Sequence, residues 1–524
     1  MKPGFQSSSS LRYAGMFLLL FLLLILSFPG NRSENDDGYF YAYAIRTYDY
    51  AQLWLPRYLI FLPFFKALLN IVQWINPQAD AYQLMCVCSS VASIASVLLL
   101  YRLLRQHFNT SHIVAFCSAA FLLLSYGYWR YAVEAEVYGI ALLLCLLSVY
   151  AACASITNAQ QGKYLALTAL LCGVTVMWYK PAGVVTCIAI PLYMIVLRTS
   201  VLKICSWAAM VVLLVVSGYA MAFYASEVDT TFWTYCNSGI QMAGGHPLNA
   251  VPVVASNVVS LNYIYAFPAV VSLIEQWFPG KLLVEEVFAA QHHTSLAILA
   301  VCTAVLFIML ALFALWKIRS SIFFQGFWKN PFVLWLVVYS AALLIVDPGS
   351  PEPWLMIQPA LFAVLGIYFF PLIVLHASKR LLYVLVFVLC LHNIVGGYLF
   401  IQKEDEDYTR FQSAWLIKNA TANDMVISLG SASAVRYLLY YGAAKVFTGE
   451  QQFQQAMLAA KQVHQHGGKI YLTDDFVHPS LTVQRRNAAA FAQVQSMLQQ
   501  QQANIHLLHP QDNTAAAVYQ WTPQ

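Results

Sequence analysis

Charged residues are scarce in this chain of 524 residues: Asp, Glu, Lys and Arg together make up 10% of it, whereas hydrophobic residues make up 60%. Soluble domains carry about a quarter charged residues. This deficit and the mean hydropathy of +0.63 predict an integral membrane protein. The net charge of +5 is small for the length, and no basic stripe or tail is present, so nothing indicates nucleic acid as a partner.

A disulfide framework and a cysteine-based metal site are also missing from the pattern. Ten of the eleven cysteines lie inside apolar segments, and only Cys236 falls in a long polar loop. Cys86 and Cys88 form a Cys-x-Cys pair, but inside an apolar segment thiols far more often pack as small core residues than bind a metal. The cysteine pattern therefore predicts no disulfide scaffold.

Long apolar runs dominate what is present. The first covers about 13–28 and follows Lys2 and Arg12; no clear small-x-small cleavage site comes after it, so it predicts an uncleaved signal-anchor. A helix that crosses a membrane needs about 20 apolar residues. With ten further runs, the sequence predicts eleven spans, the later ones at about 81–101, 112–128, 137–155, 164–179, 181–197, 204–225, 295–316, 331–347, 354–375 and 381–401.

The charges sort the connecting loops into two sets. The basic residues fall on alternate loops, which the positive-inside rule places in the cytoplasm together with the N-terminus: Arg102, Arg105, Lys163, Arg198, Lys203, Lys317, Arg319, Lys329, Lys379 and Arg380. The opposite, outer loops carry the acids: Glu34, Asp36, Asp37, Asp49, Glu134, Glu136, Glu227, Asp229, Asp347 and Glu352. With eleven spans, residues 402–524 also lie outside.

Two apolar segments do not fit this count as spans. Counting 250–278 as a span would invert the last four spans and move their basic loops outside, so we expect a re-entrant or surface-lying helix in an outer loop over 226–294. The segment 53–75 is interrupted by Pro56, Arg57, Pro63 and Lys66. It predicts amphipathic helices on the outer surface, within a first outer loop over 29–80.

Beyond the membrane part, 1–401, the sequence becomes polar and rich in Gln and Ala. Helix-like stretches at about 431–441, 450–465 and 479–501 alternate there with β-like runs at 424–429, 469–472, 504–508 and 516–521. The alternation predicts a small extracytoplasmic α/β domain over 402–524 with a partly parallel sheet. We expect His464 and His466 on a solvated helix end. Asp474-Asp475 ends a predicted strand and suits a helix N-cap or a ligand.

Three outer segments carry candidate chemistry. Asp36-Asp37 directly follows span one and precedes Tyr39; alone this would be a solvated turn, but at the membrane surface beside aromatic rings it favours a catalytic acid or base. Glu134 and Glu136 stand at the mouth of an apolar helix, where an ionisable group is usually functional, or where it favours the helix N-terminus. Lys180 lies on a predicted outer hinge and either extends to the interface or holds an anion.

At these residues the chain resembles the polytopic GT-C glycosyltransferases. Their shared motif, an acidic pair in the first outer loop, matches Asp36-Asp37. The run FLLLSYGYWRYAVEAEVYGIALLL, which contains Glu134 to Tyr138, resembles the protein O-mannosyltransferase-like branch, and the Pro-Glu-Pro-Trp element at 351–354 resembles a late Pro/Glu element of such enzymes. The resemblance implies a polytopic α-helical membrane protein of the GT-C type.

It also implies a reaction: transfer of a sugar from a polyprenyl-phosphate donor to a glycan, lipid or protein acceptor at the outer face of the inner (plasma) membrane. An inverting transfer needs a carboxylate base, and the departing phosphate needs positive charge. The roles that follow are catalysis by Asp36, Asp37 and Glu136; donor-phosphate binding by Lys180, Arg57 and Arg130; and acceptor or sugar binding by Tyr39, Glu134, Tyr138 and Glu352.

No cofactor is certain at this stage, although Asp36 and Asp37 could ligate Mg²⁺ or Mn²⁺ as in some relatives. The competing hypotheses are a lipid or glycan transporter (a flippase), a surface-polysaccharide polymerase or ligase, and a membrane scaffold. A transporter typically shows internal repeats with charges near the bilayer midplane. This chain shows no convincing repeat, and its acids cluster on the outer loops.

Overall fold

The structure is a computed structural model. It describes residues 36–157, 160–238, 246–277, 293–319, 326–401, 408–429, 432–479, 488–501, 504–509 and 517–523, together with single positions between and before these ranges. The predicted first span at 13–28 lies outside the described residues except at four positions, and Glu34 lies outside them. The chain forms two compact units: a first unit of Met1–Phe28, Ala44–Ser260 and Cys302–Asn393, and a second unit of Pro29–Tyr43, Leu261–Val301 and Ile394–Gln524.

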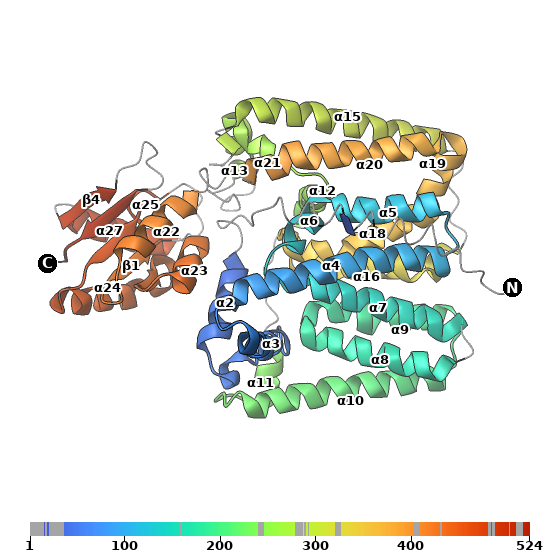
Figure 1. The fold of residues 1–524 in the computed structure, drawn as a ribbon, viewed down its shortest axis with the longest axis horizontal. Helices are drawn as coiled ribbons and strands as arrows, with labels where there is room; N and C mark the ends of the chain where they lie inside the picture. Colours follow the sequence, from blue (N-terminus) through green and yellow to red (C-terminus); the bar gives the residue numbers. More distant parts are fainter. Residues whose placement is uncertain are drawn as a thin grey trace. The chain divides into compact units, whose positions relative to one another are not determined.

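Long helices running side by side build the first unit (Figure 1). Asp80 begins one of them, because its carboxylate accepts a hydrogen bond from the Gln83 N–H at 2.9 Å and caps the helix. The helices of its first part are α2 (Asp36–Thr47, whose first residues belong to the second unit), α3 (Phe61–Ile75), α4 (Ala81–Gln106), α5 (His112–Leu124), α6 (Tyr126–Ala132), α7 (Tyr138–Thr157), α8 (Gln161–Trp178), α9 (Ile190–Val196), α10 (Val201–Ala225), and, within the predicted outer loop over 226–294, α11 (Phe232–Asn237) and α12 (Ala250–Val258).

The later helices of this unit differ in length. Three are long: α15 (Thr294–Ile318, from Cys302 on), α16 (Pro331–Val346) and α20 (Lys379–Asn393). Three are short and contain proline: α17 (Pro351–Trp354), α18 (Gln358–Val364) and α19 (Phe370–His376). Short turns connect the helices of this unit. The 3-10 turns are η1 (Tyr50–Leu53), η2 (Lys180–Ala182), η4 (Pro247–Asn249), η6 (Phe327–Lys329) and η7 (Leu355–Ile357), and the π-helical turns are η3 (Val185–Ala189) and η8 (Leu365–Phe369).

Six stretches of the described residues are long and apolar enough to cross a membrane by themselves: Ala81–Gln106, Tyr138–Ile156, Val201–Ala225, Thr294–Ile318, Pro351–His376 and Lys379–Tyr398. The bent pair α5–α6 makes a seventh, and three shorter apolar helices cover Phe61–Ile75, Lys180–Val196 and Pro331–Val346. The chain is thus a multi-pass membrane protein, and the count of eleven spans stays a prediction.

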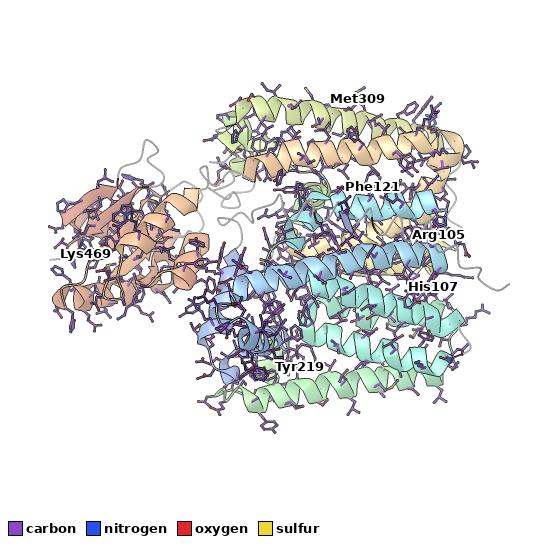
Figure 2. All side chains as sticks on the ribbon, viewed as in Figure 1. Arg105, His107, Phe121, Tyr219, Met309 and Lys469 are labelled. Carbon is purple, nitrogen blue, oxygen red and sulfur yellow. The ribbon has the colours of Figure 1, made fainter. Side chains whose placement is uncertain are left out.

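The lipid-facing helices are recognisable by exposed apolar side chains. In α10 and α15 only 11% and 22% of the most apolar stretch is buried. Met309 of α15, labelled in Figure 2, is exposed to 62%. Figure 2 also shows Arg105 of α4 and Tyr219 of α10 at opposite ends of the first unit. Arg105 belongs to the basic residues that are predicted to face the cytoplasm, so Tyr219 lies at the other end of this helical unit.

The expected span at 112–128 is not a straight helix, because α5 and α6 meet at an angle of 66°. The break falls at Ser125, whose hydroxyl donates to the Phe121 carbonyl at 2.6 Å. Just after it, Gly127 lies against Asn257 of α12, where an added Cβ would come within 2.2 Å of the Asn257 amide oxygen. The helix therefore turns where a residue without a side chain admits another segment.

The two segments that were not counted as spans form no long helix. The segment 250–278 divides into α12, η5 (Asn262–Ala266) and α13 (Pro268–Trp277). The segment 53–75 becomes helical only at Phe61, where α3 begins. Both observations agree with the expectation of re-entrant or surface-lying pieces, whose orientation to the membrane stays a prediction.

The second unit contains a five-stranded sheet in the order β2-β1-β3-β5-β4. Its first three strands pair in parallel and the remaining pairs are antiparallel, so the predicted partly parallel sheet is confirmed. Four strands match predicted β-like runs: β1 (Met425–Ser428), β3 (Ile470–Thr473), β4 (Ile505–His509) and β5 (Val518–Trp521). The sequence analysis missed the edge strand β2 (Lys445–Thr448), whose residues are only partly buried.

The helices of this unit match the predicted stretches with one difference. Within the expected helix over 479–501 the structure describes α27 (Ala488–Gln501), and the short helix α25 (Asp474–Val477), which starts at the end of β3, was not predicted. The other helices are α21 (Leu399–Ile401), α22 (Tyr408–Asn419), α23 (Ala432–Tyr441) and α24 (Gly449–Gln465), with the π turn η9 (Ile394–Tyr398). His464 and His466 lie exposed at the end of α24, as expected.

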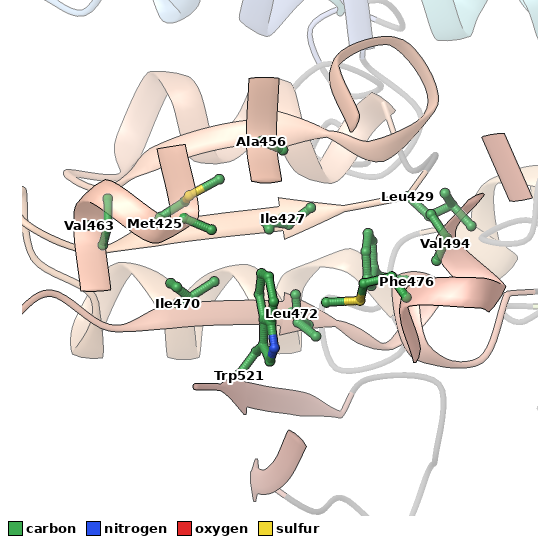
Figure 3. Close-up of a cluster of buried hydrophobic side chains, with 12 residues drawn as sticks. Met425, Ile427, Leu429, Ala456, Val463, Ile470, Leu472, Phe476, Val494 and Trp521 are labelled. Atoms are coloured by element: carbon green, nitrogen blue, oxygen red, sulfur yellow. The ribbon is translucent and has the colours of Figure 1, made fainter. Parts of the chain in front are cut away.

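An apolar core joins the sheet to its helices (Figure 3). Ile427 of β1 and Leu472 of β3 are fully buried in it, with Ala456 of α24 and Val494 of α27 packed against them. All four residues of β1 are buried, as is typical of a central parallel strand covered on both faces. The C-terminal residues thus form a small α/β domain with its own core.

Candidate active site

Arg57 lies in the irregular stretch between η1 and α3, and it is surrounded by aromatic rings. Its guanidinium carbon lies 5.3 Å from the centre of the Tyr58 ring. Its Nε is buried and has no hydrogen-bond partner among the residues that the structure describes. The backbone carbonyl of Arg57 accepts from the Lys180 N–H at 3.1 Å, which fixes the loop against the start of η2.

Three tyrosines from separate elements line this region. Tyr58 and Tyr179 stack with ring centres 6.1 Å apart and an interplanar angle of 11°. Tyr138, the first residue of α7, meets Tyr179 edge to face at 5.4 Å. Trp178 holds these elements in place, because its indole N–H donates to the Val137 carbonyl at 3.1 Å. The result is a buried aromatic wall beside the Arg57 guanidinium.

Glu352 adds a carboxylate to the wall. The Tyr138 hydroxyl donates to Glu352 Oε2 at 3.0 Å. A short relay positions the Glu352 backbone: the Asn257 amide donates to the Pro351 carbonyl at 2.8 Å, and the Gln358 amide donates to the Asn257 carbonyl at 2.8 Å. Asn257 and Gln358 are both buried, so these bonds form where unpaired polar groups are costly.

The segment before α7 holds two buried acids. Glu134 is only 1% exposed and forms an ion pair with Arg130, with 3.4 Å between its Oε1 and the Arg130 Nε. Glu136 is 5% exposed and lies two residues before the start of α7. Tyr131 lies within electrostatic reach of both acids and of Glu352. The two acids are thus buried groups of the first unit, close to the start of α7, and their functional role stays a prediction beside a role at the helix N-terminus.

Lys180 contacts other protein groups in this structure, and its two expected roles stay predictions. Its ammonium donates to the Cys236 carbonyl, and Nζ lies 5.8 Å from the centre of the Tyr219 ring. The Tyr219 hydroxyl in turn donates to the Pro56 carbonyl at 2.7 Å, next to Arg57. Lys180 therefore connects α11 to the loop that holds Arg57. Of the three predicted phosphate ligands, Arg57 is the one whose side chain has no carboxylate or carbonyl partner in the described part of the chain.

The acid pair belongs to the second unit, at the first turn of α2. Asp37 Oδ1 is paired with Arg436 of α23, and Asp37 Oδ2 accepts from the Tyr41 hydroxyl at 3.3 Å. Tyr39 is 2% exposed and packs on Tyr437 with ring centres 5.0 Å apart. The Asp36 side chain lies outside the described residues.

The described residues contain no group of three or more His, Cys, Asp or Glu side chains that could hold a metal ion. Asp37 accepts from a guanidinium and a hydroxyl, and the Asp36 side chain lies outside the described residues. Binding of Mg²⁺ or Mn²⁺ by this pair stays a prediction.

The first unit thus brings together five predicted residues from distant segments: Arg57, Glu134, Glu136, Tyr138 and Glu352. The sequence analysis missed the tyrosines that connect them, Tyr58, Tyr131 and Tyr179. The position of Tyr179 between Trp178 and Lys180, on a predicted outer hinge, could have indicated it as a site residue. It also missed Arg436, which no local pattern distinguishes from other basic residues of a helix.

Comparison with known proteins supports a family relationship for part of the chain. Residues 63–221 match the family of dolichyl-phosphate-mannose-protein mannosyltransferases. That stretch includes Glu134, Glu136, Tyr138 and Lys180, but neither the acid pair nor Glu352. No curated protein sequence matches the chain.

Solved structures match over nearly its whole length. ArnT from Cupriavidus metallidurans bound to undecaprenyl phosphate is similar with a TM-score of 0.58 and 8% identity, covering 99% of this chain and 100% of that one. The chain has a GT-C-like fold. The apo state of ArnT gives a TM-score of 0.57 at 8% identity, with 98% and 100% covered. The oligosaccharyltransferase of Archaeoglobus fulgidus, in complex with Zn and sulfate, gives 0.49 at 12% identity, with 88% and 68% covered.

These matches confirm the predicted GT-C resemblance at the level of the fold, and the roles of Asp36-Asp37 and of 134–138 stay predictions. The predicted fold class, a polytopic helical membrane protein with a small C-terminal α/β domain, is confirmed with it.

Proposed function

We propose that this protein is a membrane glycosyltransferase that moves a sugar from a polyprenyl-phosphate-linked donor to an acceptor. The observation that carries the proposal is Arg57, a half-buried guanidinium set in an aromatic wall beside Glu352 and Tyr138, in a fold shared with a protein that binds undecaprenyl phosphate. A cation without a carboxylate partner suits a phosphate, and aromatic faces suit a sugar or a lipid.

The proposed reaction is a single inverting displacement. A carboxylate takes the proton of the acceptor hydroxyl or amine, whose oxygen or nitrogen bonds to the anomeric carbon as the carbon–phosphate-oxygen bond breaks. Polyprenyl phosphate leaves as an anion, so it needs positive charge and no proton donor. We assign the base to Asp36, with Asp37 orienting it; Glu136 to the acceptor side; and Glu134, Tyr138, Glu352 and Tyr39 to acceptor or sugar contacts.

We assign the donor phosphate to Arg57, and Arg130 and Lys180 become secondary candidates because both already have partners. The acceptor is a glycan, a lipid or a protein. The site and residues 402–524 face the periplasmic side of the bacterial inner membrane in this proposal. Its support is the distribution of Lys and Arg over alternate loops.

Binding of undecaprenyl phosphate to the purified full-length protein in nanodiscs tests the donor assignment. Arg57→Ala should weaken binding about 10-fold or more, because a charge-assisted contact in a partly desolvated site contributes about 1.5–3 kcal/mol. Arg102→Ala is the matched control, since Arg102 also packs over a tyrosine ring, at 5.7 Å from the centre of Tyr150, but is exposed in the last turns of α4, at its predicted cytoplasmic end. Equal affinity of the two variants would contradict the role of Arg57.

The activity itself is tested by mass spectrometry of glycolipids and surface glycans from cells with and without the chain, followed by transfer assays with the donor so identified. Asp36→Asn is nearly isosteric and should lower transfer by about 10²–10⁴, because it removes the base. If Asp36→Asn and Asp37→Asn both keep wild-type rates, the acid pair is not the catalytic centre. If only Asp37→Asn is inactive, Asp37 and not Asp36 is the base.

A further inference from the structure

The C-terminal α/β domain contacts the segment that carries the acid pair, within the second unit. Tyr39 of α2 is almost fully buried and meets three tyrosines of α23. Ring centres of Tyr437, Tyr440 and Tyr441 lie 5.0, 6.5 and 6.0 Å from that of Tyr39. The pairs with Tyr437 and Tyr441 are edge to face, an arrangement that stabilises a fixed packing. The start of α2 is therefore packed on one face of α23.

A charged contact stands next to this aromatic packing. Arg436 of α23 pairs with Asp37 Oδ1, and its guanidinium carbon lies 5.7 Å from the centre of the Phe40 ring. The Tyr41 hydroxyl donates to the other carboxylate oxygen. The Asp37 and Arg436 side chains remain 36% and 31% exposed, so the pair lies at the edge of the packed face and is open to solvent.

The pair is poorly explained by stability alone. Ion pairs with this much exposure contribute little to folding, and the tyrosine contacts already hold the two segments together. A guanidinium does supply what a carboxylate beside a catalytic base needs. It is planar, it remains charged, and it fixes the direction of a carboxylate more strictly than a lysine can.

We propose that Arg436 is a positioning residue: through its ion pair with Asp37, α23 of the C-terminal domain sets the geometry of the acid pair during sugar transfer. The inference rests on the proposed function, since it takes Asp36-Asp37 as the catalytic acids. The C-terminal domain then takes part in the transfer reaction, because without Arg436 of α23 the Asp37 carboxylate loses the ion pair that fixes its orientation.

The kinetic test compares Arg436→Gln, Arg436→Lys and wild type in the full-length protein. We expect Arg436→Gln to lower kcat by up to about 10²-fold, as misplacement of a catalytic group does. The KM for donor should stay unchanged, because Arg57 holds the phosphate. Arg436→Lys keeps the charge without the planar geometry and should recover part of the rate. Lys445→Gln removes the same charge from an exposed position in the same domain, on β2, and should match wild type.

Hydrogen exchange of peptides covering 36–43 gives a readout that is independent of activity. Arg436→Gln should speed exchange in this segment, whereas Lys445→Gln should not. Unchanged exchange in Arg436→Gln overturns the inference whatever the activity. Faster exchange with an unchanged kcat also overturns it, because the contact is then structural only. Wild-type protein that transfers no sugar contradicts the proposed function, and the exchange measurement still decides whether the contact exists.

Discussion

Tyr138 and Glu352 lie 214 residues apart in the chain and share one hydrogen bond in the structure. The sequence marked each of them as a candidate for acceptor or sugar contact, on separate grounds, and gave no sign that they are partners. Their bond is charge-assisted and forms beside the stacked Tyr58 and Tyr179. It fixes a carboxylate in the aromatic wall, which a solvent-exposed loop could not do.

Removing the Tyr138 hydroxyl should therefore affect transfer and leave the fold intact. Tyr138→Phe keeps the ring packing and removes a donor to a carboxylate, a contact that contributes about 1.5–3 kcal/mol. We expect transfer to fall about 10- to 100-fold, measured as kcat/KM. Tyr224→Phe, at an 81% exposed position of α10, is the control. Equal rates for the two variants would remove Tyr138 from the site.

At the scale of elements, buried polar contacts decide where helices break. Asn393 of α20 donates to the carbonyls of Leu124 and Val258 at 2.7 and 2.9 Å, and its amide oxygen accepts from the Ser260 N–H. His392 Nε2 donates to the Ser260 carbonyl, so its Nδ1 accepts from the Thr303 hydroxyl at 3.0 Å. These bonds satisfy the backbone that is left unpaired at the ends of α5 and α12.

Gly127 lies in the same region, where α6 approaches α12. Gly127→Ala should displace Asn257, because the new Cβ would come within 2.2 Å of its amide oxygen and 3.2 Å of its Cα. We expect a loss of about 1–3 kcal/mol in stability, read as a lower midpoint of thermal unfolding in nanodiscs. Gly162→Ala is the control, because its Cβ would meet nothing within 4 Å in α8. An equal midpoint for both variants would contradict the close approach.

Asp424 links two strands of the C-terminal domain. Its carboxylate accepts from the Lys469 N–H and the Thr421 N–H, both at 2.7 Å, and from the Thr421 hydroxyl at 2.8 Å. Burial alone would raise the pKa of Asp424, but these hydrogen bonds outweigh burial and lower the pKa below its usual value. Because the pKa of Asp424 is lower in the folded than in the unfolded state, its ionised carboxylate stabilises the fold at pH values above the unfolded-state pKa of about 3.9. This stabilisation is lost as the pH falls through the folded-state pKa.

The Asp424→Asn variant should therefore be less stable than wild type at neutral pH, by about 1–3 kcal/mol, and the difference should shrink in acid. Hydrogen exchange in β1 and β3 of the full-length protein, corrected for the intrinsic pH dependence of exchange, measures this. Exchange that is as slow as in wild type at pH 7 would show that the carboxylate does not hold these strands.

At the scale of the whole molecule, the charge pattern predicts the orientation in the membrane. Eleven spans with the basic loops inside place the N-terminus in the cytoplasm and residues 402–524 outside. A reporter that is active only outside the cytoplasm, fused after Gln524, should be active, and the same reporter fused after Lys163 should be silent. The reverse pattern would contradict the orientation and, with it, the outer placement of the acid pair.

The sequence by itself determined the membrane class, most helical segments and the partly parallel sheet, and it named candidate site residues that stay predictions. Apolar runs and strand-helix alternation are local patterns, so they can be read without tertiary structure. The bend between α5 and α6, the edge strand β2, the Tyr138–Glu352 bond and the Asp37–Arg436 pair were decided by the tertiary structure alone. Each depends on residues far apart in the chain, which no local pattern brings together. For the buried contacts, such as those of Asn257, burial makes an unpaired polar group costly and so favours a specific partner.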